Sequence, residues 1–302
     1  MSGGNAMRCG FVAVLGPPNA GKSTLVNRIV GAKVSIVTHK VQTTRGRVTG
    51  IRNVDGDQII FVDTPGIFKP KKRLERALVE AAWSGANDAD MALLLVDGAR
   101  GLNADTRAII ERLKGKGRPA IVAINKVDAV RKGQLLPIGA ELGETDVAED
   151  IFYVSALTGE GIDDLIAGLQ QRLPDGPWMF PDDQVSDLPM RMLAAEITRE
   201  KLFLRVHQEL PYELSVETEL WTEMPEDNEV RIDQVIHVAR AAHKPILLGK
   251  GGRTIKAIGI AARKELESIL EQRVHLFLHV KVRSNWLDDP ARYREMGLEF
   301  PD

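Results

Sequence analysis

Cysteine is nearly absent from this chain of 302 residues, in which Cys9 is the only example. A single thiol cannot form an internal disulfide framework, and it cannot supply the several thiolates of a cysteine-based zinc site. The composition therefore excludes both kinds of stabilisation and fits the reducing environment inside a cell. We expect Cys9 to act as a small apolar residue at the start of a strand.

Long apolar runs, a secretion signal and a large net charge are absent as well. No run reaches the roughly 18–20 residues of a membrane-spanning helix. The first ten residues, MSGGNAMRCG, lack the apolar core of a signal peptide. We therefore expect a soluble intracellular protein, for which docking on a membrane surface stays open. The net charge of −2 gives no overall attraction to nucleic acid, so any such surface must be local.

Residues 8–172 alternate short apolar runs with helix-like segments. Near-continuous apolar strands separated by helices are typical of a mostly parallel sheet that is covered by helices on both faces. We predict an α/β domain here. The predicted strands are Gly10–Leu15, Gln58–Val62, Met91–Val96, Pro119–Ile124 and Ile151–Val154, and the clearest helices are Ala104–Lys114 and Gly161–Arg172.

Residues 173–189 break this pattern, because they contain four prolines and four aspartates without periodicity. We interpret them as a linker.

Residues 190–283 then predict an α+β domain, and residues 284–302 form a tail to which the sequence assigns no role. The elements predicted in the second domain are a helix (Met190–Val206), strands at Tyr212–Glu223 and Glu229–Ala239, a helix (Thr254–Glu271) and a strand (Arg273–Arg283).

A phosphate-binding motif follows the first predicted strand. The segment Gly16–Ser23 reads GPPNAGKS, which fits G-x-x-x-x-G-K-[ST], and it opens a helical pattern. Gly16 and Gly21 let the loop fold back, so that backbone N–H groups and the helix N-terminus surround phosphates. Lys22 then reaches the β- and γ-phosphates, and the Ser23 hydroxyl binds Mg²⁺. This motif alone does not separate ATP from GTP.

Two further motifs favour GTP. Asp63-Thr64-Pro65-Gly66 ends one predicted strand, where Asp63 can hold Mg²⁺ through water and the Gly66 N–H can meet the γ-phosphate. The segment 125–128, NKVD, ends another strand, and the Asp128 carboxylate can accept hydrogen bonds from guanine N1 and N2. Adenine would leave that carboxylate unpaired, at a high cost in binding. Backbone N–H groups of the segment 155–157, SAL, complete a base pocket at guanine O6. All of these motifs lie at carboxyl ends of strands, where open α/β sheets bind ligands.

The set GPPNAGKS, DTPG, NKVD and SAL resembles the translation-factor class of GTPases, and the segment 42–45, QTTR, resembles switch I of the Era family. In that class, a switch I threonine closes over Mg²⁺ when the γ-phosphate is present. The resemblance makes Thr44 the first choice for this ligand and Thr43 the second. The implied cofactors are GTP or GDP and Mg²⁺, with Ser23, Thr44 and, through water, Asp63 at the metal. Residues expected at the nucleotide are Gly16, Pro17, Pro18, Asn19, Ala20, Gly21, Lys22, Ser23, Thr24, Asp63, Thr64, Pro65, Gly66, Ile67, Asn125, Lys126, Asp128, Ser155 and Ala156.

One departure concerns the catalytic step. Ras-like enzymes carry a glutamine directly after this D-x-x-G motif to orient the attacking water, whereas this chain has Ile67. We expect slow intrinsic hydrolysis, with Lys22, Thr44, Gly66 and Asn19 as the catalytic candidates. In related GTPases that have asparagine at the position of Asn19, K⁺ neutralises the developing charge. The alternative is that Asn19 is a turn residue that tolerates left-handed backbone.

A G-x-x-G loop, Gly249-Lys250-Gly251-Gly252, lies in the second domain. It follows two predicted strands and opens a helix, which is the order of a type II KH domain, whose G-x-x-G loop clamps about four unpaired nucleotides. Residues 240–283 carry a charge of +7, and residues 209–233 carry −8, so the domain has one basic region. We expect RNA contacts from Gly249, Lys250, Gly251, Gly252, Arg253 and Lys256.

The whole chain resembles the Era family, a GTPase domain joined by a short linker to a KH domain. This resemblance implies binding near the 3′ end of 16S ribosomal RNA, a role in assembling the 30S subunit, and peripheral association with the cytoplasmic face of the inner membrane. We expect a monomer. Two alternatives stay open: a non-catalytic RNA-binding module gated by GTP, and a membrane-associated signalling GTPase that uses the basic cluster Lys69–Arg73.

Overall fold

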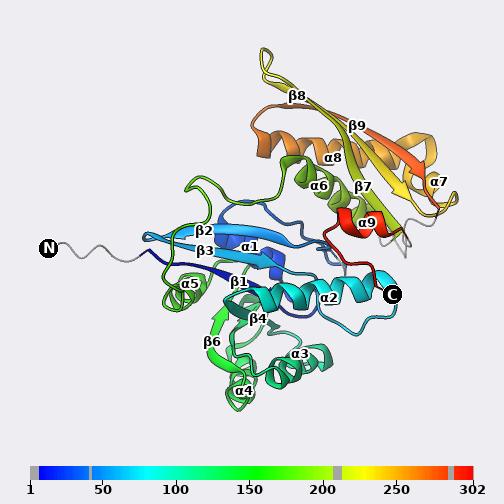
Figure 1. Cartoon of the computed structure of the whole chain (residues 1–302). Coiled ribbons are helices and arrows are strands. Elements are labelled where there is room, and N and C mark those ends of the chain that lie inside the picture. The colour runs from blue at the N-terminus through cyan, green and yellow to red at the C-terminus, as the bar shows by residue number, and fades with distance from the viewer. Residues whose placement is uncertain (1–6, 41–42, 207–212, 285–288, 302) are drawn as a thin grey trace. The chain divides into compact units, whose positions relative to one another are not determined.

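Two separate sheets organise the chain in this computed structural model, which describes residues 7–40, 43–206, 213–284 and 289–301 (Figure 1). One compact unit comprises Met1–Asp187 together with Met296–Asp302, and the other comprises Leu188–Glu295. Gln42, Tyr212 and Trp286 lie outside the described residues. Within the described ranges, no helix is long and apolar enough to cross a bilayer.

The first unit is built on a six-stranded sheet with the strand order β2-β3-β1-β4-β5-β6. All neighbouring strands are parallel except β2, which runs antiparallel to β3. The described elements are β1 (Cys9–Leu15), α1 (Lys22–Val30), β2 (Val48–Val54), β3 (Asp57–Asp63), α2 (Arg73–Asp88), β4 (Met91–Asp97), α3 (Ala104–Gly115), β5 (Ala120–Asn125), the 3-10 turn η1 (Val127–Ala129), α4 (Lys132–Gly143), β6 (Ala148–Val154) and α5 (Ile162–Gln170).

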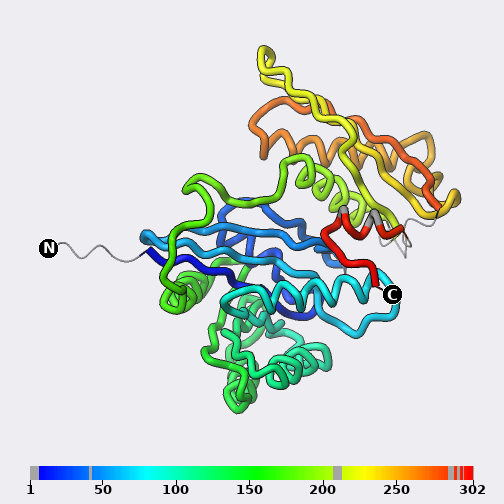
Figure 2. The backbone as a smooth tube through the Cα atoms, viewed as in Figure 1, coloured from blue at the N-terminus to red at the C-terminus, as the bar shows by residue number. Residues whose placement is uncertain are grey.

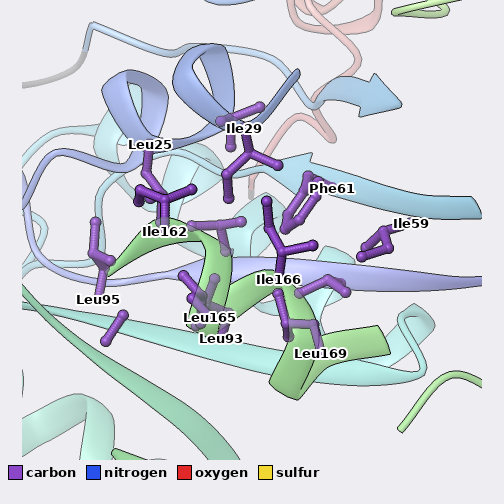
Figure 3. Packing of buried hydrophobic residues seen from close by; sticks show 14 of the residues in the cluster. Leu25, Ile29, Ile59, Phe61, Leu93, Leu95, Ile162, Leu165, Ile166 and Leu169 are labelled. Atoms are coloured by element: carbon purple, nitrogen blue, oxygen red, sulfur yellow. The ribbon is translucent and has the colours of Figure 1, made fainter. Parts of the chain in front are cut away.

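Apolar side chains on both faces of the central strands explain the layers. Side chains alternate across a strand, and β1 sends Val12 and Val14 into one core while Ala13 and Leu15 enter the other. The first core joins the sheet to α1 and α5, and Figure 3 shows part of it. The second core joins the sheet to α2, α3 and α4. The predicted fold of this part, a mostly parallel sheet with helices on both faces, is confirmed.

Strand β2 was missed by the sequence analysis, although a turn signal was present. Asp55 and Gly56 join β2 to β3, and both have positive φ, 48° and 89°. Val54 pairs with Asp57 across this turn, which is the geometry of a two-residue hairpin of the Asp-Gly kind. The hairpin makes β2 the edge strand of the sheet.

The predicted linker lies along that edge rather than free in solvent. The Ile51 N–H donates to the Val185 carbonyl over 2.9 Å, and the Ser186 hydroxyl donates to the Thr49 carbonyl over 2.6 Å. The Gln58 side chain accepts from the backbone N–H groups of Met179 and Phe180. These bonds satisfy part of the exposed edge of β2, and they place the linker up to Asp187 in the first unit.

The second unit has a three-stranded sheet with the order β7-β8-β9. Strand β8 is antiparallel to β7 and parallel to β9, and residues of α6 and α8 share its two apolar cores. The predicted α-β-β-loop-helix-β order is confirmed, and the short α7 and α9 are additional. The elements are α6 (Met190–Arg205), β7 (Leu214–Met224), β8 (Glu229–Val238), α7 (His243–Leu248), the 3-10 turn η3 (Lys250–Gly252), α8 (Arg253–Leu270), β9 (Arg273–Val282) and α9 (Pro290–Glu295).

The predicted tail divides between the two units, because its last residues, Met296–Asp302, belong to the first unit. The Arg73 guanidinium at the start of α2 lies 4.9 Å from the centre of the Phe300 ring. The Met296 carbonyl lies 3.0 Å from the position that a Cβ on Gly46 would occupy, and Leu298 is buried. Residues 296–301, at the red end of the tube in Figure 2, therefore pack near Gly46 and Arg73 of the first unit.

Candidate nucleotide site and RNA-binding loop

The loop Gly16–Ser23 between β1 and α1 is shaped by two glycines. Gly16 has φ 151° and Gly21 has φ 99°. A Cβ on Gly16 would lie 2.6 Å from the Leu95 carbonyl oxygen, and one on Gly21 would lie 2.3 Å from Asn125 Nδ2. Both positions therefore require glycine. Because α1 begins at Lys22, the free N–H groups of its first turn are available at this loop for an anion.

Lys22 is buried inside the loop. Its Nζ donates to the carbonyls of Gly16 and Pro17, over 3.1 Å in each case. Burial lowers the pKa of Lys22 to about 8, and the Asp63 carboxylate opposes part of that shift. The ammonium group is thus held among backbone oxygens at the place where the motif expects phosphate.

Ser23, Thr44 and Asp63 come together as the metal prediction requires. Ser23 Oγ donates to Asp63 Oδ2 over 2.7 Å. Thr44 Oγ1 lies 3.0 Å from Ser23 Oγ and 3.2 Å from Asp63 Oδ2. By contrast, Thr43 Oγ1 lies 2.7 Å from the Lys40 carbonyl and 2.8 Å from Thr38 Oγ1. This is a cluster of hard oxygen atoms of the kind that Mg²⁺ prefers.

The Asp63 carboxylate has a free oxygen in this cluster. The side chain is fully buried, and its Oδ1 has no hydrogen-bond partner among the described residues. Burial raises the pKa of Asp63, against the hydroxyl hydrogen bonds and the Lys22 charge that favour the carboxylate. A buried polar atom without a partner is costly, and a metal-bound water would satisfy it. The residues present therefore fit Mg²⁺.

The NKVD and SAL motifs are tied to the phosphate loop. Asn125 Nδ2 donates to the Ala20 carbonyl over 2.8 Å, and its Oδ1 accepts from the Ala156 N–H over 2.9 Å. Lys126 Nζ donates to the Asn19 carbonyl over 2.8 Å. One side-chain network thus joins motifs that are more than a hundred residues apart in the sequence.

Two carboxylates belong to this network. Ser155 Oγ donates to Asp128 Oδ1 over 2.5 Å, so the base-reading candidate already has a fixed neighbour. Lys126 Nζ also bonds Asp97 Oδ2 over 2.6 Å. Asp97 was missed by the sequence analysis, although its place at the end of β4, on the same edge as the other motifs, was a usable signal.

A cavity of about 510 Å³ opens between these motifs. Predicted residues that line it are Pro18, Asn19, Gly21, Lys22, Ser23, Thr24, Thr44, Thr64, Gly66, Asn125, Lys126, Asp128 and Ala156. Leu157 of the predicted SAL segment and Thr43, the second choice of the switch threonines, line it as well. Lining residues that were not predicted are Ile36, Val37, Thr38, His39, Lys40 and Ala129. The segment 36–40 carries no spacing motif of its own, so only its place before QTTR could have indicated it.

Ile67 does not face this cavity. Its side chain is buried in the second core of the sheet, and its N–H donates to the Gly16 carbonyl over 3.1 Å. The preceding Gly66 lies so close to the phosphate loop that a Cβ there would be 2.9 Å from the Pro18 side chain. The chain after Asp63 is thereby fastened to the loop, and the side chain of Ile67 cannot touch a water beside the phosphates.

Asn19 has the left-handed backbone expected of a turn residue, and its side chain also makes a hydrogen bond. Its φ is 64°, which is the left-handed conformation that asparagine tolerates. Its Nδ2 donates to the His39 carbonyl over 3.0 Å. Asn19 therefore connects the phosphate loop to the segment that leads into switch I.

The G-x-x-G loop of the second unit has an open geometry. Gly249, Gly251 and Gly252 have φ of 70°, 61° and 74°. A Cβ on Gly249 would collide with the Thr254 side chain, whereas no atom of the residues that the structure describes lies within 4 Å of one on Gly251 or Gly252. The side chains of Lys250, Arg253 and Lys256 are exposed around the start of α8. Backbone and positive charge are thus both accessible to a phosphate chain.

Family models match a part of each unit of the chain. Residues 11–126 match the 50S ribosome-binding GTPase family, and residues 209–287 match the KH domain family. GTPase Era of Mesorhizobium japonicum is 62% identical over 296 residues, which are 98% of this chain and 95% of that protein. GTPase Era of Sinorhizobium medicae is 61% identical over 97% of this chain and 94% of its own length.

Two solved structures share the fold over nearly the full chain. One is Era in complex with MgGDPNP and nucleotides 1506–1542 of 16S ribosomal RNA, and the other is a variant of Aquifex aeolicus Era bound to GDP·AlF4⁻. Each is 40% identical with a TM-score of 0.91, and each match covers 96% of this chain and 99% of the other. Together with the two sites described above, these matches show that the chain belongs to the Era family of GTPases with a C-terminal KH domain.

Proposed function

We propose that this GTPase is a slow GTP-dependent switch that binds 16S ribosomal RNA near its 3′ end and assists assembly of the 30S subunit. The observation that carries the proposal is the joint presence of a built nucleotide site and an open G-x-x-G loop in one chain. A relative that shares 40% identity was solved with both MgGDPNP and nucleotides 1506–1542 of 16S ribosomal RNA. Conservation of the fold over 96% of this chain supports the same pair of ligands here.

In the nucleotide site, Lys22 would exchange its two carbonyl partners for the β- and γ-phosphates, beside the N–H groups of the first turn of α1. Asp128 would accept from guanine N1 and N2, and backbone N–H of the segment 155–157 would meet O6. The Asn125 and Lys126 contacts hold these groups at one place. At the phosphates, Lys22 and the N–H groups of α1 are preorganised donors, and such donors are the main source of catalysis in phosphoryl transfer.

At the metal, Ser23 and Thr44 would bind Mg²⁺ directly and Asp63 would bind it through water. When bound there, Mg²⁺ would supply positive charge that offsets the charge developing on the phosphates. The contact between Thr44 and Ser23 supports Thr44 over Thr43, since Thr43 is engaged with Lys40 and Thr38. In the class of GTPases that this chain resembles, a switch I threonine closes over the metal when the γ-phosphate is present, and Thr44 would take that role.

K⁺ is proposed as an accessory cofactor at Asn19. Because the Ile67 side chain lies in the core, no side chain there replaces the glutamine of Ras-like enzymes, and extra positive charge near the phosphates would offset part of that loss. Hydrolysis should be faster in KCl than in NaCl of equal ionic strength, and Asn19→Ala should abolish the difference. Equal rates of the parent in both salts would leave Asn19 with its turn and His39 contact alone.

In the RNA-binding loop, Gly249–Gly252 would approach the sugar-phosphate backbone, and Lys250, Arg253 and Lys256 would contact phosphates.

A monomer is proposed, with peripheral membrane association as a secondary property. In the basic segment Lys69–Arg73, the backbone N–H groups of Lys71 and Lys72 bond Glu75 and Arg73 stacks on Phe300, while the side chains of Lys71 and Lys72 are exposed. Anionic lipid therefore stays an alternative ligand of this segment.

Single-turnover GTP hydrolysis, measured with and without purified 30S subunits, tests the proposal. We expect slow hydrolysis alone and faster hydrolysis with subunits. No hydrolysis in either case would favour a non-catalytic RNA-binding module. Stimulation by anionic vesicles, with flotation on them and without retention of RNA on filters, would instead favour a membrane-associated signalling GTPase.

A further inference from the structure

Ser35 makes a contact that the motifs do not account for. It lies in the segment between α1 and switch I, it is 3% exposed, and its Oγ donates to Asp63 Oδ2 over 2.7 Å. This distance equals that of the Ser23 bond to the same oxygen. Three hydroxyls, those of Ser23, Ser35 and Thr44, thus meet at one carboxylate oxygen.

The backbone around Ser35 is held by a single side chain of α1. Asn27 Oδ1 accepts from the N–H groups of Val34 and Ser35 over 3.0 and 2.9 Å. Asn27 Nδ2 donates to the Ser35 carbonyl over 2.7 Å. Three hydrogen bonds from one amide thus satisfy the N–H and the carbonyl of Ser35 and the N–H of Val34, and they fix the backbone that carries the Ser35 hydroxyl.

The turn that brings Ser35 back to Asp63 starts at the end of the same helix. Gly31 has φ 79° and donates its N–H to the Asn27 carbonyl over 3.0 Å. Asn27 lies four residues after Ser23, one helical turn further along α1. The helix that carries the metal ligand Ser23 therefore also carries the residue that positions Ser35.

The three hydroxyls at Asp63 differ in what Mg²⁺ would do to them. Under the proposed function, the oxygens of Ser23 and Thr44 bind the metal, and their bonds to Asp63 must rearrange as metal and nucleotide enter and leave. Ser35 is not a metal ligand in that arrangement. Its hydrogen bond can persist in all states, which leaves Asp63 Oδ1, the oxygen without a partner, directed at the metal-bound water.

We propose that Ser35, clamped by Asn27, is a positioning residue that holds the Asp63 carboxylate in the orientation needed for Mg²⁺. This inference rests on the proposed function, because it assumes the metal at Ser23 and Thr44. Partners that orient the ligands of a metal site are worth about 10–100-fold in metal affinity. The same contact would tie the segment before switch I to the carboxylate that senses the metal.

The test measures the Mg²⁺ concentration that half-saturates tight binding of a fluorescent GDP analogue to the full chain. In Ser35→Ala, we expect this concentration to rise about 10-fold, while affinity for the analogue in excess EDTA stays at the parent value. Ser35→Thr, which keeps a hydroxyl, should recover most of the loss. Asn27→Asp keeps the acceptor for Val34 and Ser35 but loses the donor to the Ser35 carbonyl, so it should give a smaller rise.

A matched control separates positioning from loss of a buried hydroxyl. Thr106 is fully buried in the same unit, and its Oγ1 bonds Asn103 far from the nucleotide motifs in the sequence. Thr106→Val should lower the melting temperature without moving the Mg²⁺ midpoint. A Ser35→Ala chain with a lower melting temperature and the parent midpoint would overturn the positioning role.

A different binding result would contradict the proposed Mg²⁺ site itself. If the parent bound the analogue equally in Mg²⁺ and in EDTA, the proposed metal site would be wrong, and the role of Ser35 would be rejected with it. If Ser35→Ala does not fold, Asn27→Asp carries the decision, since an unchanged midpoint in that variant would also reject the inference.

Discussion

The glycine loops of the two units differ in the space around them. In the nucleotide loop, a Cβ on Gly16 or Gly21 would meet Leu95 or Asn125 at 2.6 Å or less. In the G-x-x-G loop, a Cβ on Gly251 or Gly252 would meet no atom of the described residues within 4 Å. The first loop uses glycine because the protein itself fills the space. In the second, the described part of the chain leaves this space open.

The polar groups of the two loops differ in the same way. Lys22, Asp63 and Asn125 are buried and bonded to groups of the protein, so the nucleotide site is largely assembled before its ligand arrives. Lys250 and Lys256 are exposed. Binding at a preorganised buried site depends on precise hydrogen bonds, whereas binding at an exposed basic loop depends on charge and on salt. Substitutions at the two sites should therefore have distinct signatures.

The largest effect is expected for Asp128→Asn. The amide is a donor where guanine N1 and N2 also donate, so GTP affinity should fall by about 10³-fold or more. Xanthine has an acceptor at O2, and XTP affinity should rise correspondingly. Competition binding with both nucleotides checks this, and the contact with Ser155 should survive because the amide retains an oxygen. Equal GTP affinity of variant and parent would remove Asp128 as the base reader.

The next effect concerns Lys250 and Gly251 changed together to aspartate. Two carboxylates at the start of α8 would repel phosphate, and a side chain at residue 251 would occupy the open space beside the loop. RNA affinity should fall about 100-fold at low salt, and the salt dependence should weaken by about one released counterion for the lost lysine. Hydrolysis of GTP by the free protein should stay within about two-fold.

That double substitution also tests the comparison between the loops. The helix should tolerate it, because acidic residues near a helix N-terminus suit the dipole. Lys250→Gln with Gly251 kept is the matched control, and it should lose only the part of the RNA affinity that depends on the charge of Lys250. RNA affinity that survives the double change would place the RNA surface elsewhere, and the loop role would be withdrawn.

A smaller effect follows from the pKa of Lys22, which burial lowers to about 8 in the free protein. Bound phosphates favour the charged form, so above pH 8 nucleotide binding must take up a proton. Affinity for GDP should therefore fall as pH rises, approaching a tenfold loss per pH unit above pH 8. The unfolding free energy of the free protein should instead rise with pH. Between pH 8 and 10.5, the unfolded chain binds the Lys22 proton more tightly than the folded chain does.

Lys22→Arg is the control for this titration, because arginine stays protonated throughout the range. The affinity of this variant for GDP will be lower, but it should stay constant between pH 7.5 and 9.5. Calorimetry in buffers of different ionisation enthalpy measures it. A parent affinity that is equally flat over this range would show that Lys22 is already charged in the free site.

The sequence predicted elements and motifs well where periodicity or spacing is strong. The apolar strands β1, β3, β4 and β5 were found because they are buried on both faces, and the motifs were found because phosphate and guanine impose fixed spacings. Ser35 could not be found, since a lone serine before switch I has no pattern and acquires its role only when α1 turns back at Gly31. The linker was predicted as a spacer because prolines mark it, but pairing of Val185 with the edge of β2 depends on a strand that the analysis missed.

The smallest effect is expected at the C-terminal segment, where the ring of Phe300 lies against Arg73 at the start of α2. A cation–π contact of this kind is worth about 0.5–1 kcal/mol when partly exposed. Phe300→Ala should thus lower the unfolding free energy of the first unit by about 1 kcal/mol, including some lost apolar contact. Phe300→Leu keeps an apolar side chain and should lose less. Calorimetry can identify the transition of the first unit as the one that GDP shifts upward. A Phe300→Ala chain in which that transition is unmoved would mean that the segment does not stabilise the nucleotide-binding unit in solution.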